Sequence, residues 1–273
     1  MSATSEHLER IEHAGVSALV RTGDASRTVM CLHGIGSNAQ SFTYLFPAWP
    51  QGPQLIAWDA PGYGASAAFD IHWPEPVAYA SYLQSFLDAC GIATVDLVGH
   101  SLGCLMAGAF ATRLPTRMRH LALLSPALGY NVPRNSVLPP AIAARITDLE
   151  LQGAESFAAM RAARLVHRPE AKPAVVAAVR TAMARVSLPG YAQAVRMLAS
   201  GDLIAEARHI VAPTLILNGE DDVVTPKAGA QRLHAACPGS QLVLIPDAGH
   251  ALPQEAPEHI AALLSRVFAG GAA

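Results

Sequence analysis

The chain has 273 residues, of which 51% are hydrophobic and 15% charged. A chain of this length and composition can bury a sizeable core, which excludes a fibrous or disordered protein. Its formal net charge is −2, and the chain contains no run of basic residues, so we expect a small-molecule partner and not a nucleic acid.

The first elements along the chain have the patterns of β-strands. Residues 11–20 alternate in polarity around Gly15, which predicts a hairpin. Residues 28–32 are continuously apolar and end at His33-Gly34, which predicts a buried strand. Similar short apolar runs follow at residues 55–58, 95–98, 121–124, 214–217 and 242–245. Continuous apolar runs of this kind are typical of parallel strands that helices cover on both faces.

Segments of helical length lie between these strands. They are residues 39–46, 77–89, 102–113, 228–236 and 257–268. Because strand and helix alternate, the pattern predicts right-handed βαβ units. The fold class that we expect is therefore α/β, with a doubly wound, mostly parallel sheet.

One long segment breaks this alternation. Residues 127–208 contain no convincing strand but several stretches with helical periodicity, punctuated by prolines. We therefore predict a core domain made of residues 1–126 and 209–273, with residues 127–208 inserted as a helical cap. The cap has ten Lys and Arg against six Asp and Glu, a formal charge of +4, whereas the rest of the chain carries −6.

Cysteine usage and hydropathy bear on metals, disulfides and membranes. The four cysteines are far apart, with no CxxC motif or Cys/His cluster, so we expect neither a metal site nor a disulfide framework. The longest apolar run, residues 102–111, is too short to span a bilayer, and the N-terminal residues lack the pattern of a signal peptide. We expect a cytoplasmic protein with no membrane partner.

The sequence Gly99-His100-Ser101-Leu102-Gly103 follows a predicted buried strand and opens a predicted helix. This is the context in which Gly-x-Ser-x-Gly forms a sharp turn that exposes a nucleophilic serine. Two small residues flank the turn because strand and helix approach closely there. The backbone N–H of Leu102, at the start of the helix, is in position to stabilise an oxyanion.

A second loop ends the predicted strand at residues 28–32. His33-Gly34-Ile35-Gly36 consists largely of small residues, and such a loop can lend a second backbone N–H to the same oxyanion. Ile35 is our candidate donor, and His33 and Gly34 are candidates for contact with the substrate. On its own, a glycine-rich loop is more often a tight turn.

A nucleophilic serine needs a base, and the chain has eleven histidines. His250 is the best placed, because it follows the last predicted strand and so falls on the same edge of the sheet as Ser101. An acid that orients the base should follow the preceding strand, where Glu220, Asp221 and Asp222 are adjacent. Position alone does not choose among these three carboxylates.

At this point the chain resembles the α/β-hydrolase fold family, over nearly its whole length. The family's motif Gly-x-x-Asp-x-Val-x-Pro, laid on residues 219–226, selects Asp222 as the acid. The order serine, acid, histidine along the chain also matches the family. Residues 59–66 resemble the family's turn after the third core strand, and we assign no catalytic role to it. The resemblance implies an α/β-hydrolase sheet with a helical cap.

The resemblance also implies a mechanism. His250 would take the proton of Ser101 as the serine attacks an acyl carbon, Asp222 would stabilise the imidazolium, and the N–H groups of Ile35 and Leu102 would bind the oxyanion. Water would then release the acyl-enzyme. This chemistry needs no cofactor.

Three functions are compatible with these residues. An ester or lactone hydrolase is the first choice. The runner-up is cleavage of a C–C bond in a meta-cleavage product, a vinylogous 1,5-diketone of aromatic catabolism. Enzymes of that kind usually have a more glycine-rich oxyanion loop and a Trp after the catalytic histidine, whereas this chain has HGIG and Ala251. The third reading, a small-ligand binder without activity, is disfavoured because no triad residue is missing.

The basic cap suggests an anionic substrate, because an Arg fork matches a carboxylate. Arg161, Arg164 and Arg168 are the candidates that we expect at the substrate. Other cap arginines are further candidates, namely Arg180, Arg185 and Arg196. Any single arginine on an amphipathic helix is more often solvated, but we expect at least one of them to point into the pocket. The sequence is compatible with a homo-oligomer and does not fix the oligomeric state.

Overall fold

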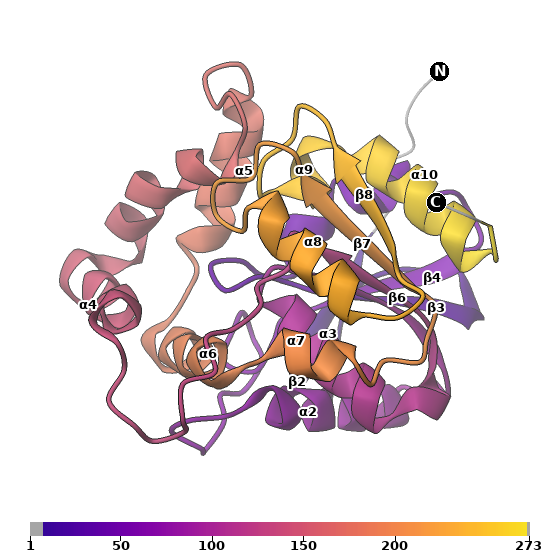
Figure 1. The fold of residues 1–273 in the computed structure, drawn as a ribbon, viewed down its shortest axis with the longest axis horizontal. Coiled ribbons are helices and arrows are strands. Elements are labelled where there is room, and N and C mark those ends of the chain that lie inside the picture. Colours follow the sequence, from indigo (N-terminus) through magenta and orange to yellow (C-terminus); the bar gives the residue numbers. More distant parts are fainter. Residues whose placement is uncertain (1–7, 272–273) are drawn as a thin grey trace.

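The computed structural model describes residues 8–271, and in that part of the chain eight strands form one central sheet (Figure 1). The polar residues 1–7 lie outside the described residues. The strands are β1 (Glu9–His13), β2 (Val16–Arg21), β3 (Asp24–Leu32), β4 (Pro53–Trp58), β5 (Val95–His100), β6 (Met118–Leu124), β7 (Thr214–Gly219) and β8 (Gln241–Ile245).

The strand order across the sheet is β1-β2-β4-β3-β5-β6-β7-β8. The hairpin predicted around Gly15 is confirmed, because β1 and β2 pair antiparallel on either side of it. Strand β2 is also antiparallel to β4, and every later pair is parallel. The predicted fold class, a mostly parallel α/β sheet, is therefore confirmed.

Helices cover both faces of the sheet (Figure 1). Strand β5 shows why: Leu97 packs into the core on one face, and its neighbour Val98 packs into the core on the other. The first face carries α2 (Pro76–Ala89), α3 (Gly103–Arg113), α7 (Leu203–Ala207) and α8 (Lys227–Ala236). The second carries η1 (Ala39–Phe42), α1 (Leu45–Ala48), α9 (Leu252–Glu255) and α10 (Pro257–Phe268). A short 3₁₀ turn, η2 (Pro115–Arg117), leads into β6.

The single helix that the sequence predicted over residues 39–46 is wrong. The chain instead forms η1, whose N-terminus is capped by the Asn38 side chain, and then starts a new helix, α1, at Leu45. Pro47 explains the break, because it lacks an N–H and therefore fits only the first turn of a helix. The two short helices bring the segment after β3 back over the sheet.

Between β6 and β7 the described chain forms only helices: α4 (Pro140–Arg161), η3 (Ala162–Leu165), α5 (Pro173–Met183), α6 (Leu188–Ser200) and α7. The first four lie over one edge of the sheet, at the left in Figure 1, whereas α7 packs against α3 and α8. Helix α4 bends at Gly153, whose φ of 71° favours glycine. No helix in residues 8–271 is long and apolar enough to cross a membrane.

Candidate active site

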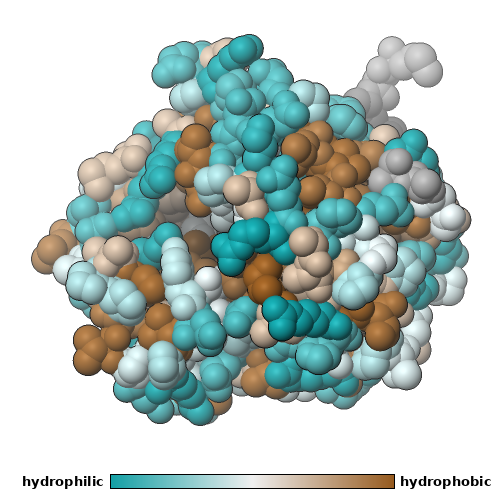
Figure 2. Space-filling view, in the orientation of Figure 1, coloured by the Kyte–Doolittle hydropathy of each residue, from teal (hydrophilic) through white to brown (hydrophobic). Residues whose placement is uncertain are grey.

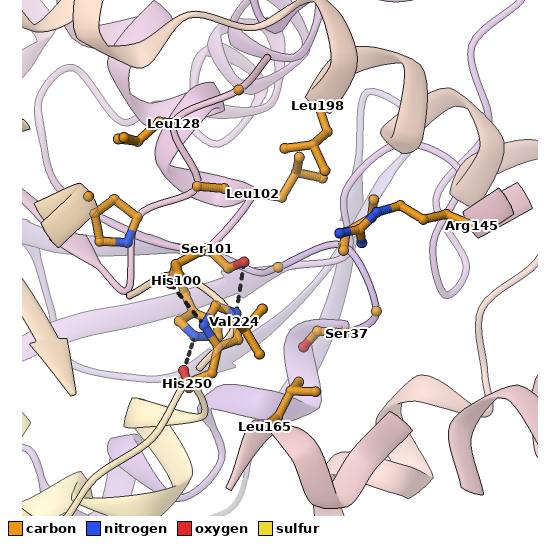
Figure 3. A pocket seen from close by; sticks show the side chains of 18 of the residues that line it. Ser37, His100, Ser101, Leu102, Leu128, Arg145, Leu165, Leu198, Val224 and His250 are labelled. Carbon is orange, nitrogen blue, oxygen red and sulfur yellow. Dashed lines mark hydrogen bonds between the residues drawn. The ribbon is translucent and has the colours of Figure 1, made fainter. Parts of the chain in front are cut away.

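A cavity of about 470 Å³ lies between the cap helices and the carboxyl ends of the parallel strands. Figure 2 shows the surface hollowed between the cap and the body, and Figure 3 shows the cavity from close by. Its floor contains Ser101, Leu102 and His250, and its walls come from the loop after β3, from α4 and α6, and from α8. The cavity is therefore made jointly by the core and the cap.

Ser101 occupies a sharp turn between β5 and α3. Its φ is 53°, a left-handed conformation that is uncommon for a residue with a side chain. A Cβ on Gly99 would lie 2.7 Å from the Gly103 carbonyl oxygen, and a Cβ on Gly103 would overlap the Leu32 carbonyl. Both flanking glycines are thus required by close packing of strand and helix, as the sequence suggested, and the turn holds the Ser101 side chain at the cavity floor.

Ser101, His250 and Asp222 form a continuous hydrogen-bonded chain. The Ser101 hydroxyl lies 3.0 Å from His250 Nε2, and His250 Nδ1 lies 2.9 Å from Asp222 Oδ2. Each comes from a loop at the same edge of the sheet, after β5, β8 and β7 respectively. The contacts expected of Asp222 are present, whereas Asp221 is half exposed and lies 3.7 Å from His167. With Nδ1 protonated, His250 presents a free lone pair on Nε2 to the serine.

The Asp222 carboxylate is held ionised. Burial raises its pKa, but the hydrogen bond and charge of His250 and the hydrogen bonds from Thr225 outweigh this and lower the pKa to about 2. Oδ1 accepts from the backbone N–H groups of Val224 at 2.8 Å and Thr225 at 2.9 Å. Every lone pair that points into the protein is therefore matched by a donor, and the carboxylate can stabilise a positive charge on His250.

The two residues expected to form an oxyanion hole both line the cavity beside Ser101. Among the hydrogen bonds of residues 8–271, none is donated by the backbone N–H of Ile35 or of Leu102. The Ile35 carbonyl is fixed from the other side, because it accepts a hydrogen bond of 2.6 Å from the Tyr63 hydroxyl. Gly34 packs tightly against the nucleophile, since a Cβ there would lie 3.1 Å from Ser101 Cβ. Both amides thus remain available to a ligand.

Comparison with known proteins places this geometry in a family. Residues 29–263 match the profile of the alpha/beta hydrolase family. The chain belongs to that family. It is 28% identical over 258 residues to a pimeloyl-[acyl-carrier protein] methyl ester esterase of Neisseria meningitidis serogroup B. The alignment covers 91% of this chain and 95% of the relative.

Solved structures share the fold of this alpha/beta hydrolase. An esterase from Thermogutta terrifontis superposes with a TM-score of 0.83 at 22% identity, covering 96% of this chain and 98% of the other. An enol-lactonase from Burkholderia xenovorans LB400 superposes with a TM-score of 0.82 at 21% identity, covering 96% of this chain and all of the other. At these identities the likeness concerns the fold alone.

Two side chains that sequence reasoning missed support the hydrogen-bonded chain. The Thr225 hydroxyl lies 2.8 Å from Asp222 Oδ2 and 3.1 Å from His250 Nδ1. The ring of His100 donates to the His250 carbonyl at 2.8 Å, while its Nδ1 is buried with no partner among the described residues. Burial and the neighbouring His250 lower the pKa of His100 to about 3, so this ring is neutral. Neither residue has a sequence signal beyond its place in a motif.

The cap is also fastened to the loop that carries His250. The Leu165 carbonyl accepts from the backbone N–H groups of His250 at 2.9 Å and of Ala251 at 3.0 Å. The fully buried Glu255 carboxylate accepts from Gly249 N–H, from His167 N–H and from Lys172 Nζ, at 3.0, 2.9 and 3.1 Å. The position of His250 in this hydrolase therefore depends on the cap as well as on the sheet.

Two of the residues predicted to contact substrate do not line the cavity. His33 is buried beneath the loop: its Nδ1 donates to the Gly34 carbonyl and its Nε2 accepts from Ala60 N–H, so both ring nitrogens are used. Arg168 is 70% exposed and pairs with Asp247 at 3.3 Å outside the cavity. The prediction was wrong for both, because His33 connects two loops and Arg168 lies on the surface.

Gly34, Arg161 and Arg164 do line the cavity, so at least one of the expected cap arginines points into it. Arg180, Arg185 and Arg196 are absent from its wall. The sequence analysis missed Arg145 of α4 and Arg232 of α8, which line the cavity as well. Within the described residues, no group of three or more His, Cys, Asp or Glu side chains could hold a metal ion.

Proposed function

We propose that this alpha/beta hydrolase cleaves a small carboxylic ester or lactone through an acyl-enzyme on Ser101. The observation that carries the proposal is the hydrogen-bonded chain from Ser101 through His250 to the buried Asp222 at the floor of a cavity. A serine joined to a base, with the base oriented by a carboxylate, is the arrangement of acyl-transfer hydrolases on several folds.

In the proposed mechanism, the Ser101 oxygen attacks the substrate carbonyl carbon while its proton passes to His250 Nε2. The tetrahedral oxyanion accepts hydrogen bonds from the amides of Ile35 and Leu102. As the intermediate collapses, His250 returns the proton to the departing alkoxide, and the alcohol leaves. A water molecule then attacks the acyl-enzyme while His250 takes its proton, and His250 returns that proton to the Ser101 oxygen as the intermediate collapses, which releases the acid and restores the serine. Asp222 stays ionised throughout and stabilises the imidazolium.

The Neisseria meningitidis relative, a methyl ester esterase, favours an oxygen ester over a C–C bond. The solved structures of similar fold include both an enol-lactonase and a 2-hydroxy-6-oxo-6-phenylhexa-2,4-dienoate hydrolase, so the fold alone does not decide the bond type. We therefore propose that this chain hydrolyses an ester or a lactone. Cleavage of a vinylogous 1,5-diketone, the alternative raised by the sequence, is kept as an outcome of the test.

The test compares three bond types on one purified sample. We expect turnover of p-nitrophenyl butyrate or of a small lactone, and no turnover of a vinylogous 1,5-diketone. Ser101→Ala should abolish turnover without unfolding the protein, and the losses in Ser101→Ala and His250→Ala should not add in the double variant, because the residues act as one unit. Ser81→Ala, an exposed serine of α2, serves as the control. Turnover near wild type in Ser101→Ala would overturn the proposal.

We also propose that the protein works in the cytoplasm. Its four cysteines, all within the described residues, are free thiols, as is usual in a reducing compartment. Fractionation of the native cells should recover the protein with cytoplasmic markers. Recovery from the periplasm or the medium would contradict this location.

A further inference from the structure

Among the described residues, four arginines and no Asp or Glu side chain line the cavity. Arg145 and Arg161 belong to α4, Arg164 to η3 and Arg232 to α8. A cavity lined by charge of one sign concentrates ligands of the opposite sign. The four arginines differ, however, in what surrounds each guanidinium, and that difference decides which of them is free to bind a ligand.

Arg161 already has an ionic partner. Its Nη2 lies 2.5 Å from Asp148 Oδ2, and its guanidinium stacks 4.5 Å from the centre of the Phe157 ring. Arg164 is exposed and donates to the Val223 carbonyl at 3.4 Å, and Arg232 is exposed as well. The charge of Arg161 is therefore neutralised within the protein, and the charges of Arg164 and Arg232 are largely solvated.

Arg145 is different. It is half buried, and none of the ion pairs among residues 8–271 includes it. In Figure 3 its side chain extends from α4 into the cavity. The buried Tyr191 lines the same cavity, and its side chain interacts with the Arg145 guanidinium. A phenol in that setting is uncharged, because burial raises the pKa of Tyr191. Arg145 thus keeps an unneutralised charge and further N–H donors for a ligand.

We propose that Arg145 binds a carboxylate carried by the substrate, which makes the substrates monoesters of dicarboxylic acids, or lactones that bear a carboxylate. The planar guanidinium fork matches the two oxygens of a carboxylate. The cavity is otherwise mostly apolar, with Leu102 on its floor beside Ser101 and with Leu128 and Leu198 on its walls (Figure 3). An apolar chain or ring therefore separates the scissile carbonyl at Ser101 from the carboxylate at Arg145. This inference rests on the proposed ester hydrolysis.

The test uses two chromogenic esters that differ only in charge: p-nitrophenyl hydrogen adipate and p-nitrophenyl methyl adipate. Wild-type protein should hydrolyse the anionic ester with a kcat/KM at least about 10-fold higher. Arg145→Gln should raise KM for the anionic ester about 10- to 100-fold, the range expected when a charged hydrogen-bond partner is lost, and should change KM for the neutral ester far less. Arg145→Lys, which keeps the charge but not the fork, should fall between the two.

The matched control is Arg180→Gln, which removes the same charge from an exposed position of α5 that does not line the cavity. Equal kcat/KM for both esters in the wild type, or equal losses in Arg145→Gln and Arg180→Gln, would overturn the proposal. Melting curves establish that each variant folds.

A binding measurement separates this proposal from the proposed function. Calorimetric titration of Ser101→Ala with monomethyl adipate should show binding that Arg145→Gln in the same background weakens about 10- to 100-fold. If wild-type protein hydrolyses no ester but this Arg145-dependent binding is present, the hydrolase mechanism fails and the carboxylate site stands. If neutral esters are hydrolysed and monomethyl adipate binds no better than dimethyl adipate, the carboxylate site fails and the hydrolase stands.

Discussion

Replacing Asp222 with Asn should cost this hydrolase most of its turnover while leaving its shape intact. Asn is close in size to Asp, and its Oδ1 can still accept from the N–H groups of Val224 and Thr225. Its Nδ2, however, would face His250 Nδ1 in place of an oxygen. His250 would then carry its proton on Nε2, pointing at Ser101, and could not accept the serine proton.

The size of the loss follows from two contributions. The environment lowers the pKa of Asp222 from its usual 3.8 to about 2 in spite of burial, which corresponds to about 2–3 kcal/mol of net stabilisation of the carboxylate, with the hydrogen bond and charge of His250 as the largest favourable contributions. Losing that stabilisation for the imidazolium slows turnover by about 10²-fold, since ~1.4 kcal/mol is a factor of ten. The wrong tautomer adds a further factor, so we expect kcat to fall by about 10²–10⁴.

The assay is initial-rate hydrolysis of p-nitrophenyl butyrate with purified variants at pH 7. Asp221→Asn and Glu220→Gln are the matched controls, because both carboxylates lie in the same loop but are exposed to solvent. Each should change kcat by less than about 5-fold, since exposed charges contribute under ~1 kcal/mol. If Asp221→Asn lowered kcat as much as Asp222→Asn did, or if Asp222→Asn stayed within a few-fold of wild type, the assignment of the acid would be refuted.

Two further predictions concern stability. The buried His100 has a pKa of about 3 instead of its usual 6.5, so between these values it binds fewer protons in the folded than in the unfolded state. The free energy of unfolding, measured in urea, should therefore fall from pH 7 to pH 5, and this fall should be ~2 kcal/mol smaller in His100→Gln. An equal fall in both proteins would contradict this. Glu255→Gln leaves Lys172 without its ionic partner and should lower the free energy of unfolding by about 2–4 kcal/mol. The control Glu258→Gln, at an exposed position, should leave the free energy of unfolding nearly unchanged. Similar losses in the two variants would rule out the buried pair as the cause.

The sheet and the positions of Ser101 and His250 could be predicted because each depends on a local pattern, whereas the choice of Asp222 over its two acidic neighbours also needed the resemblance to the family's motif. Continuous apolar runs marked the buried strands, and the residue after each run had to fall at one edge of a parallel sheet. The glycines around Ser101 marked a turn that excludes larger residues. These patterns are short in sequence, so no knowledge of distant contacts was needed.

The walls of the cavity could not be predicted in the same way. Whether Arg145 or Arg168 faces the substrate depends on how α4 and the segment after η3 are turned, and α4 lacks a strong apolar stripe that would fix its rotation from sequence. His33 resembles a pocket residue in sequence, yet its ring is used by Ala60 N–H, a partner 27 residues away. The link from Leu165 to the His250 loop joins residues 85 apart and left no local signal.

Covalent trapping of the nucleophile tests the central claim most directly. Titration with an equimolar fluorophosphonate, followed by intact-mass measurement and peptide mapping, should show one phosphonyl group per chain, attached to Ser101, with ester hydrolysis lost in proportion to labelling. Because His250 activates the Ser101 hydroxyl, we expect both Ser101→Ala and His250→Ala to remain unlabelled under the same conditions. Labelling at another residue, or full hydrolysis by a chain already labelled at Ser101, would contradict the account.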